Sequence, residues 1–324
     1  MNRIYYDCGT TNTRGYLFEN TQLKYTLAIP TGSKDAALSD NRLLLLHALK
    51  EIYDGLLTAG NLCESEISEI WMSGMISSST GLIEIPHLTA PIDRLSLKKG
   101  IVCYHESLCF KRDIYIIPGI KTVPPSGQIN FDTFDQVNNM RGEETEIFGI
   151  LDQYPCFSEN SIIILPGSHT QVAFIQHGSI VNILSAITGE LYDALSHHTI
   201  LSTSLCSEEK MEIIPEMVVR GLQVLEELGI NRALYTIRTM ELFLNSTDSE
   251  RHSYFEGILN GGIVRLIKSL LPADEYPQVV VYGSSETIEV FRALFNALNL
   301  GLTITGVEKG SVPYSAYGFL CLSR

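Results

Sequence analysis

The chain has 324 residues, 45% of them hydrophobic, which is long enough for two domains with sizeable cores. Its formal net charge is −14 and it has no basic run, which argues against nucleic acid or an anionic membrane as a main partner. Seven cysteines without a Cys-x-x-Cys pair, short apolar runs and no secretory leader pattern predict a cytoplasmic protein without a zinc cluster.

The first half begins with short β-rich runs separated by polar turns, which predict strands at 4–7, 15–18 and 23–29. A helix follows, with Ser39 or Asp40 as its N-cap. Its apolar residues recur at helical spacing: Leu45, Leu49, Ile52 and Leu56. Further buried strands are predicted at 70–73 and 114–117.

The second half repeats this order, with strands predicted at 162–165, 171–176 and 179–185. Two helices are indicated by apolar stripes: Val218, Leu222 and Leu225, then Phe255, Ile258, Leu259 and Leu266. A strand at 279–282, a helix with Ser285 as N-cap, a strand at 302–305 and a closing helix at 313–322 complete the chain. This repeat predicts two lobes around a cleft, with the boundary in the loop-rich stretch 124–138.

The strongest local feature is the stretch from Asp7 to Arg14, Asp-Cys-Gly-Thr-Thr-Asn-Thr-Arg. A glycine lets the backbone approach an anion, hydroxyl and N–H groups donate to phosphate, and a carboxylate can hold Mg²⁺ through water. An ordinary β-hairpin explains the same residues equally well, because turns favour Gly, Thr and Asn. Both interpretations stay open on this segment alone.

Three further segments carry candidate chemistry. Met140-Arg-Gly-Glu-Glu-Thr145 predicts a helix start, where the glutamates either cap a surface helix or supply a general base. Pro166-Gly-Ser-His169 is a turn between two strands, where the second half should carry a phosphate loop. Gly283-Ser-Ser285 lies between a strand and a helix, where backbone can contact a nucleotide.

Taken in order, these segments resemble the superfamily of sugar kinases, heat-shock ATPases and actin. The stretch from Gly142 to Gly149 is similar to Gly-Asp-Gln-Gln-Ala-Ala-Leu-Phe-Gly of glycerol-kinase-like enzymes, which puts Glu143 at their catalytic aspartate. Within the superfamily the chain resembles the 2-dehydro-3-deoxygalactonokinases over almost its whole length. The matching segments are 7–14, 73–78, 116–120, 140–145, 166–169 and 188–191.

The chain departs from that family at two places. After its histidine the family has one residue, then Lys and Trp, whereas this chain has Thr170, Gln171 and Val172. The family's Trp after the first Asp is Cys8 here. The missing Lys removes a cation near the phosphate or sugar-acid site that the resemblance implies.

The resemblance implies a two-lobed α/β fold of the actin-like ATPase type, with an RNase H-like core in each lobe. Residues 1–135 would form the N-terminal lobe, with the first phosphate loop and the sugar-acid pocket. Residues 136–324 would form the C-terminal lobe, with the base helix, the second phosphate loop and the adenosine site. The implied reaction is phosphorylation by ATP of a 2-keto-3-deoxy sugar acid, 2-dehydro-3-deoxy-D-galactonate giving its 6-phosphate.

The resemblance also assigns roles to residues. Glu143 would be the general base, Asp7 would hold Mg²⁺ through water, and Arg14 would act beside them. Phosphates would be bound by Gly9, Thr10, Thr11, Asn12, Gly167, Ser168 and His169. Adenosine would be bound by Gly283, Ser284 and Ser285, and the sugar acid by Gly74, Met75, Ser77, Arg141 and Glu190.

Two alternatives remain at this point. One is a kinase for a different sugar acid or polyol, and the other is a catalytically weak nucleotide-binding sensor of the same fold. The intact Asp7, Arg14 and Glu143 argue against the sensor. The expected small-molecule partners are ATP and a sugar acid, and a homodimer is the expected assembly.

Overall fold

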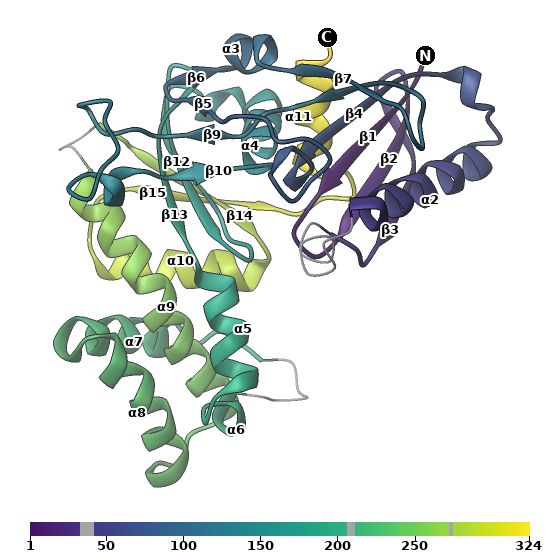
Figure 1. Ribbon diagram of the computed structural model, residues 1–324. Coiled ribbons are helices and arrows are strands. Elements are labelled where there is room, and N and C mark those ends of the chain that lie inside the picture. Colours follow the sequence, from purple (N-terminus) through teal and green to yellow (C-terminus); the bar gives the residue numbers. More distant parts are fainter. Residues whose placement is uncertain (33–41, 206–210, 272–274) are drawn as a thin grey trace. The chain divides into compact units, whose positions relative to one another are not determined.

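The computed structural model describes residues 1–32, 42–205, 211–271 and 275–324, and its chain divides into two compact units (Figure 1). Unit 1 comprises Met1–Glu159, Gln176–Ile183 and Gly310–Arg324, and unit 2 comprises Asn160–Ile175 and Leu184–Lys309. Within the described ranges, none of the helices combines the length and the apolar character needed to cross a bilayer.

This division differs from the expected lobes 1–135 and 136–324, because two helices from distant parts of the chain pack tightly within unit 1. They are α4 (Glu143–Gln153) and α11 (Tyr314–Leu322). A Cβ on Gly149 would lie 1.8 Å from the Tyr314 carbonyl oxygen, and a Cβ on Gly318 would lie 1.8 Å from the Thr145 carbonyl oxygen. Glycines therefore let the two backbones touch, which keeps both helices in one core.

Unit 1 contains a six-stranded sheet in the order β3-β2-β1-β4-β8-β7. Its strands are β1 (Asn2–Cys8), β2 (Thr13–Glu19), β3 (Gln22–Ile29), β4 (Ile67–Gly74), β7 (Val102–Glu106) and β8 (Arg112–Ile116). β1 pairs antiparallel with β2 and parallel with β4, and β4 pairs parallel with β8. The strands predicted at 4–7, 15–18, 23–29, 70–73 and 114–117 are confirmed.

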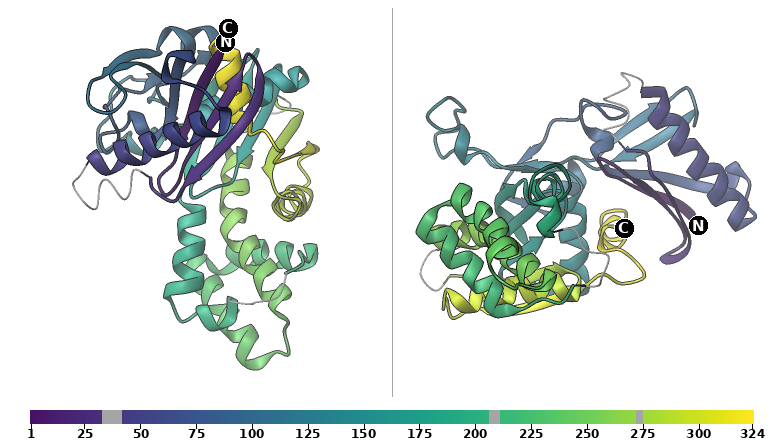
Figure 2. Two further views of the ribbon diagram at one scale, coloured as in Figure 1. Left: turned by 90° about the vertical axis from the view of Figure 1, so that its right-hand side faces the viewer. Right: turned by 90° about the horizontal axis from the view of Figure 1, so that it is seen from below.

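The two faces of β1 are covered by different helices. Tyr6 belongs to the core that α2 (Arg42–Gly60) closes with Leu49 and Leu56, and Figures 1 and 2 show α2 along this side of the sheet. On the other face Tyr5 stacks on Phe319 of α11, with ring centroids 5.0 Å apart. Because side chains alternate along a strand, Asp7 follows Tyr5 onto the α11 side. The helix predicted from Leu45 to Leu56 is confirmed, while its caps Ser39 and Asp40 lie outside the described residues.

Unit 1 also holds short elements that the sequence pattern did not predict. A three-stranded sheet has the order β10-β9-β5, from β5 (Leu88–Thr89), β9 (Ile120–Lys121) and β10 (Asn139–Met140). The others are β6 (Ile92–Asp93), α3 (Arg94–Lys99), and the 3₁₀ turns η1 (Glu64–Glu66), η2 (Met75–Ser77), η3 (Phe134–Gln136) and η4 (Pro155–Phe157). Strands of two residues are too short for alternation to reveal them.

Unit 2 repeats the strand order of unit 1. Its strands are β11 (Asn160–Leu165), β12 (Thr170–Gln176), β13 (Ser179–Ala186), β14 (Gln278–Gly283) and β15 (Thr303–Glu308). Their order is β15-β14-β11-β12-β13, and β11 pairs parallel with β14 as β14 does with β15. Residues 176–183 of β12 and β13 are counted with unit 1, where β6 pairs with β13. The repeated meander followed by parallel strands is therefore confirmed.

The helices of unit 2 fall into two groups. α10 (Ser285–Ala297) packs on β14 and β15 and also contacts α7 and α9. The others share a core around Phe255 and Ile258, and Figure 1 shows these helices gathered together: α5 (Thr188–His198), α6 (Ser202–Leu205), α7 (Pro215–Leu228), α8 (Ile230–Phe243) and α9 (Asp248–Leu270). Two details correct the sequence prediction. Ser284 caps α10 instead of Ser285, and Leu266 is 48% exposed instead of joining the apolar stripe.

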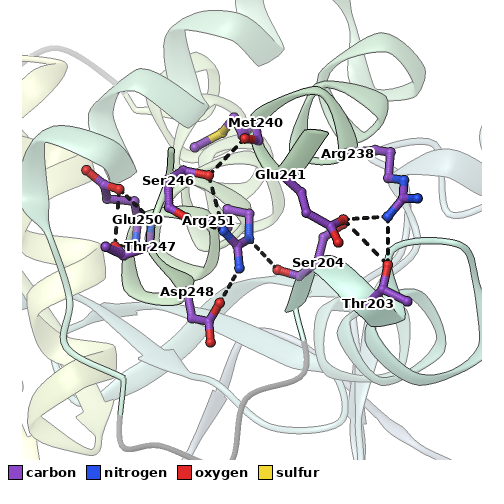
Figure 3. Close-up of polar contacts among 10 residues, drawn as sticks. All are labelled: Thr203, Ser204, Arg238, Met240, Glu241, Ser246, Thr247, Asp248, Glu250 and Arg251. Atoms are coloured by element: carbon purple, nitrogen blue, oxygen red, sulfur yellow. Dashed lines mark hydrogen bonds and ion pairs between the residues drawn. The ribbon is translucent and has the colours of Figure 1, made fainter. Parts of the chain in front are cut away.

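One buried arginine ties this helical group together (Figure 3). Arg251 of α9 is 8% exposed, and its Nε donates to the Ser204 carbonyl at 2.7 Å. The same guanidinium donates to the Ser246 carbonyl and to the Asp248 carboxylate. It therefore joins α6 and the turn before α9 to α9 itself.

We expect Arg251→Leu to lower the free energy of unfolding, measured in urea, by about 2–4 kcal/mol, because the substitution leaves the carbonyls of Ser204 and Ser246 without their donor. Arg265→Leu on the same helix is the matched control, since the Arg265 side chain is 48% exposed and pairs with Glu226 at 3.3 Å. A surface pair of this kind contributes less than about 1 kcal/mol. Equal losses for the two variants would contradict the prediction.

Candidate active site

The first predicted phosphate loop is the tight turn between β1 and β2. Asp7 lies opposite Arg14 in the antiparallel register, and the Gly9 N–H donates to the Asn12 carbonyl at 2.9 Å. Between them Thr11 is exposed, and its Oγ1 accepts a hydrogen bond from the Asn12 side chain at 3.1 Å. The segment is therefore a hairpin whose tip presents hydroxyl and amide groups, and phosphate binding by it stays a prediction.

Asp7 occupies a largely desolvated position at the end of β1. Burial raises the pKa of Asp7, while the charge of Arg14 and the nearby Ser315 hydroxyl oppose that rise. Ser315 Oγ is buried and makes no hydrogen bond of normal geometry within the described part of the chain. A carboxylate and an unsatisfied hydroxyl thus share one site, which suits a group that brings positive charge or further hydrogen bonds.

Two glycines bring a second carboxylate to this site. Gly74 ends β4 beside Cys8 and has a φ of +83°. There is no room for a side chain at this position, because a Cβ on Gly74 would lie 2.4 Å from the Cys8 carbonyl oxygen. Gly142 has a φ of +115°, and its Cβ would lie 3.1 Å from Gly74 Cα. The start of α4 therefore packs directly against the end of β4, next to the end of β1.

The two glutamates after Gly142 have different surroundings. The carboxylate of Glu143 accepts the Arg141 backbone N–H at 3.1 Å, and burial together with the charge of Asp7 raises the pKa of Glu143 to about 7. Glu144 is fully buried, and its two oxygens accept the Gly142 N–H at 2.9 and 2.8 Å. Burial and the charge of Glu143 raise the pKa of Glu144 to about 8. Glu144 thus supports the helix start, while Glu143 keeps partial access to solvent.

The predicted sugar-pocket residues of unit 1 form one braced corner. Arg141 Nη1 donates to the Ser77 carbonyl at 2.6 Å and to Ser77 Oγ at 2.5 Å, and Nη2 donates to the Ile85 carbonyl at 3.1 Å. Ser77 is fully buried, and Met75 begins the 3₁₀ turn that carries it. Arg141 therefore holds the segment after Gly74 in place with most of its donors.

The second loop lies in unit 2, where the start of α5 braces it. A Cβ on Gly189 would lie 2.2 Å from the Gly167 carbonyl oxygen, and the Glu190 N–H donates to the Ser168 carbonyl at 3.0 Å. The Glu190 carboxylate lies 3.6 Å from His169 Nε2. The Pro-Gly-Ser-His and Thr-Gly-Glu-Leu segments therefore pack together, and Glu190 lies beside the second loop.

The third turn, at the end of β14, also lies in unit 2. Ser284 Oγ accepts the Thr287 N–H at 3.2 Å, which places Gly283 immediately before the N-cap of α10. Ser285 is exposed at the first helical position. The turn thus presents backbone and hydroxyl groups at a helix N-terminus.

The departures from the family pattern occupy buried positions. Cys8 is 2% exposed and belongs to the core under α2, and Val172 is fully buried in β12. Gln171 is 5% exposed, and its Oε1 accepts a hydrogen bond from Ser185 at 2.8 Å. The helix-capping role that the sequence left open for the glutamates is filled by Glu144, whereas sequence reasoning missed both Ser315 beside Asp7 and His87 beside Arg141. No spacing pattern links the last two to the motifs, since their proximity comes from tertiary packing.

Residues 7–311 match the family model of 2-keto-3-deoxy-galactonokinase. The chain belongs to this family. It is 24% identical over 239 residues to the 2-dehydro-3-deoxygalactonokinase of Escherichia coli (strain K12), covering 74% of each chain. The predicted carbohydrate kinase is thereby confirmed, with ATP as its nucleotide.

Two solved structures show the same fold. A protein from Sinorhizobium meliloti, described as a 2-dehydro-3-deoxygalactonokinase, gives a TM-score of 0.76 at 18% identity, covering 99% of this chain and 94% of its own. The activator of the 2-hydroxyisocaproyl-CoA dehydratase from Clostridium difficile, with bound ADPNP, gives 0.51 at 13% identity, covering 100% and 94%. The predicted actin-like ATPase fold, with an RNase H-like core in each half, is confirmed.

Gly74→Ala tests the close contact that places Glu143. We expect it to lower the free energy of unfolding by at least about 2 kcal/mol, because the new Cβ meets the Cys8 carbonyl and the left-handed φ disfavours alanine. Gly262→Ala is the matched control, since a Cβ there meets nothing within 4 Å. That helical substitution should stabilise by about 0.5–1 kcal/mol. Denaturant melts that find Gly74→Ala neutral would refute the prediction.

Proposed function

We propose that this kinase transfers the γ-phosphoryl group of ATP to the primary hydroxyl of a 2-keto-3-deoxy sugar acid, converting 2-dehydro-3-deoxy-D-galactonate to its 6-phosphate. The observation that carries the proposal is the Glu143 carboxylate, held beside the Asp7 loop in a chain that matches the family over residues 7–311. A carboxylate next to a phosphate-type loop can accept the proton of a hydroxyl that attacks the phosphate, and a raised pKa is typical of such functional groups.

Nucleotide binding is assigned to three turns. In unit 1, Gly9, Thr10, Thr11 and Asn12 offer backbone N–H and hydroxyl donors to phosphate oxygens. In unit 2, Gly167, Ser168 and His169 do the same from the loop braced by α5, and Gly283, Ser284 and Ser285 contact adenosine. Backbone donors explain how a protein of net charge −14 binds a nucleotide without a basic patch.

Mg²⁺ fits the site around Asp7. The described residues contain no group of three or more His, Cys, Asp or Glu side chains able to hold a metal ion, so a site made by protein ligands alone is not expected there. One carboxylate, with water and phosphate oxygens as the other ligands, is a usual arrangement for Mg²⁺. Asp7 would hold the ion, which would neutralise phosphate charge, and the unsatisfied Ser315 hydroxyl fits a water of its shell.

Glu143 is the proposed general base and Glu144 its support. The base accepts the proton of the primary hydroxyl as the hydroxyl oxygen attacks the γ-phosphorus, and the bond to the β,γ-bridging oxygen breaks. Arg14 is exposed opposite Asp7 in the register, so it is the cation proposed to stabilise the transferring group. Arg141 is proposed to shape the acceptor pocket with Gly74, Met75 and Ser77, and Glu190 to act from the second loop.

The function is tested by a coupled assay of ADP release over a panel of acceptors. The panel holds 2-keto-3-deoxygalactonate, 2-keto-3-deoxygluconate, glycerol and neutral hexoses, each against a blank without acceptor. We expect turnover with the sugar acids, highest for the galactonate form, and product phosphorylated at the terminal carbon by ³¹P NMR. Turnover with neutral acceptors alone would refute the proposal. A rate equal to the blank for every acceptor would favour the sensor alternative.

The paired variants Glu143→Gln and Glu144→Gln test which carboxylate is the base. We expect Glu143→Gln to lower kcat by about 100- to 10,000-fold, with the KM for ATP little changed, because a general base contributes that much. Glu144→Gln keeps one oxygen for the Gly142 N–H and should lower kcat far less. The opposite ranking would move the base to Glu144, and full activity in both would leave the mechanism without its base.

The pH profile tests the surroundings of Glu143. Its carboxyl must be ionised to accept a proton, and its pKa is raised to about 7, so activity is lost as pH falls through that value. We expect kcat/KM to drop about tenfold per pH unit below 7, reaching about 100-fold below the plateau at pH 5. A fall in kcat/KM centred near the ordinary glutamate pKa of about 4.5 would contradict this assignment. A fall near pH 7 that persists in Glu143→Gln would contradict it as well.

A further inference from the structure

One face of the short sheet β10-β9-β5 gathers nitrogen-bearing side chains. Ile120 of β9 pairs with Leu88 and Met140, and the next residue, Lys121, pairs with Thr89 and Asn139. Ile120 and Met140 are 0% and 1% exposed, so their face of the sheet is buried. Because side chains alternate, the opposite face carries Lys121, and with it the residues two positions away on each strand.

Those neighbouring positions hold Gly119, His87 and Arg141, in contact with one another. A Cβ on Gly119 would lie 2.8 Å from His87 Cδ2 and 3.2 Å from Arg141 Cβ. Arg141 Nη2 lies 3.2 and 3.1 Å from the two ring nitrogens of His87. Burial and the charges of Arg141 and Lys121 lower the pKa of His87 to about 4, so the imidazole is neutral at physiological pH.

On this face the Lys121 ammonium is the cation whose N–H groups have no hydrogen-bond acceptor among the described residues. Throughout the described ranges no hydrogen bond or ion pair engages it, although the residue is partly buried. The guanidinium of Arg141, in contrast, is occupied by Ser77 and Ile85. The acidic groups acting on Arg141 are Glu144, which is hydrogen-bonded to the Gly142 N–H, and the exposed Glu84. The positive charge of Lys121 is therefore not neutralised by an ion pair within the described ranges.

We infer that Lys121, with His87 beside it, binds the carboxylate of the acceptor and so makes the enzyme select sugar acids over neutral sugars. The inference rests on the proposed function and assigns to Lys121 the binding of the carboxylate group. The face lies close to the base, because the Arg141 N–H donates to the Glu143 carboxylate. An acceptor can therefore place its carboxylate at Lys121 and its terminal hydroxyl at Glu143. An ammonium bound to a carboxylate makes one of the stronger hydrogen bonds in proteins.

The test compares wild type with Lys121→Met, Lys121→Arg and the control Lys99→Met, whose lysine is exposed on α3. For Lys121→Met we expect the KM for the sugar acid to rise about 10- to 100-fold, the amount that a lost charged hydrogen bond gives. The kcat at saturating acid and the KM for ATP should stay within about twofold, since Lys121 contacts the carboxylate end of the acceptor and not the reacting hydroxyl in this account. Lys121→Arg should recover most of the affinity, and Lys99→Met should match wild type.

Calorimetric binding of the sugar acid, with a non-hydrolysable ATP analogue present, gives the same comparison without turnover. Wild-type turnover of sugar acids with unchanged acid affinity in Lys121→Met would overturn the role of Lys121 and leave the proposed function standing. Wild-type turnover of neutral acceptors alone would overturn both. Thermal melts of each variant, with Lys121→Gln as a second neutral substitution, separate lost binding from lost folding.

Discussion

The contact between Gly74 and Gly142 is the constraint on which the proposed chemistry depends. A Cβ at either position would meet backbone, at 2.4 Å from the Cys8 carbonyl in one case and 3.1 Å from Gly74 Cα in the other. Because both residues lack a side chain and adopt positive φ, the base helix can begin beside the end of the first strand. The contact thereby fixes Glu143 near Asp7 before any ligand binds, which is the preorganisation that phosphoryl transfer needs.

This packing brings several carboxyl groups close together, and the two glutamates among them have different surroundings. The charge of Asp7 acts on Glu143 and that of Glu143 acts on Glu144, and burial raises the pKa of each of the three. Glu144 is held by two contacts to the Gly142 N–H and serves the helix, while Glu143 remains partly accessible. Among the described residues, Arg14 is the charged side chain that opposes the rise in the pKa of Asp7. The site therefore favours a bound cation, which agrees with the proposed Mg²⁺.

The sequence predicted the glycine turns and missed the face that carries Lys121 and His87, for a physical reason. Glycine turns and long periodic elements carry local signals, because a left-handed φ or a buried stripe constrains neighbouring residues. Lys121 and His87 meet only through pairing of two-residue strands, which leave no periodic trace. The division into two units differs from the expected boundary after residue 135 for a similar reason. Helix α11 packs against α4 in unit 1, although about half of the chain separates the two helices. The N-cap of α10 differed by one residue, Ser284 for Ser285, because adjacent serines offer the same capping chemistry.

The most direct test is a crystal structure of the protein with Mg²⁺, a non-hydrolysable ATP analogue and 2-keto-3-deoxygalactonate. The account predicts that the terminal hydroxyl of the acceptor lies about 2.6–3.2 Å from a Glu143 carboxylate oxygen and points toward the γ-phosphate. A hydroxyl that instead contacts Glu144, or that lies beyond hydrogen-bond reach of both glutamates, would contradict it.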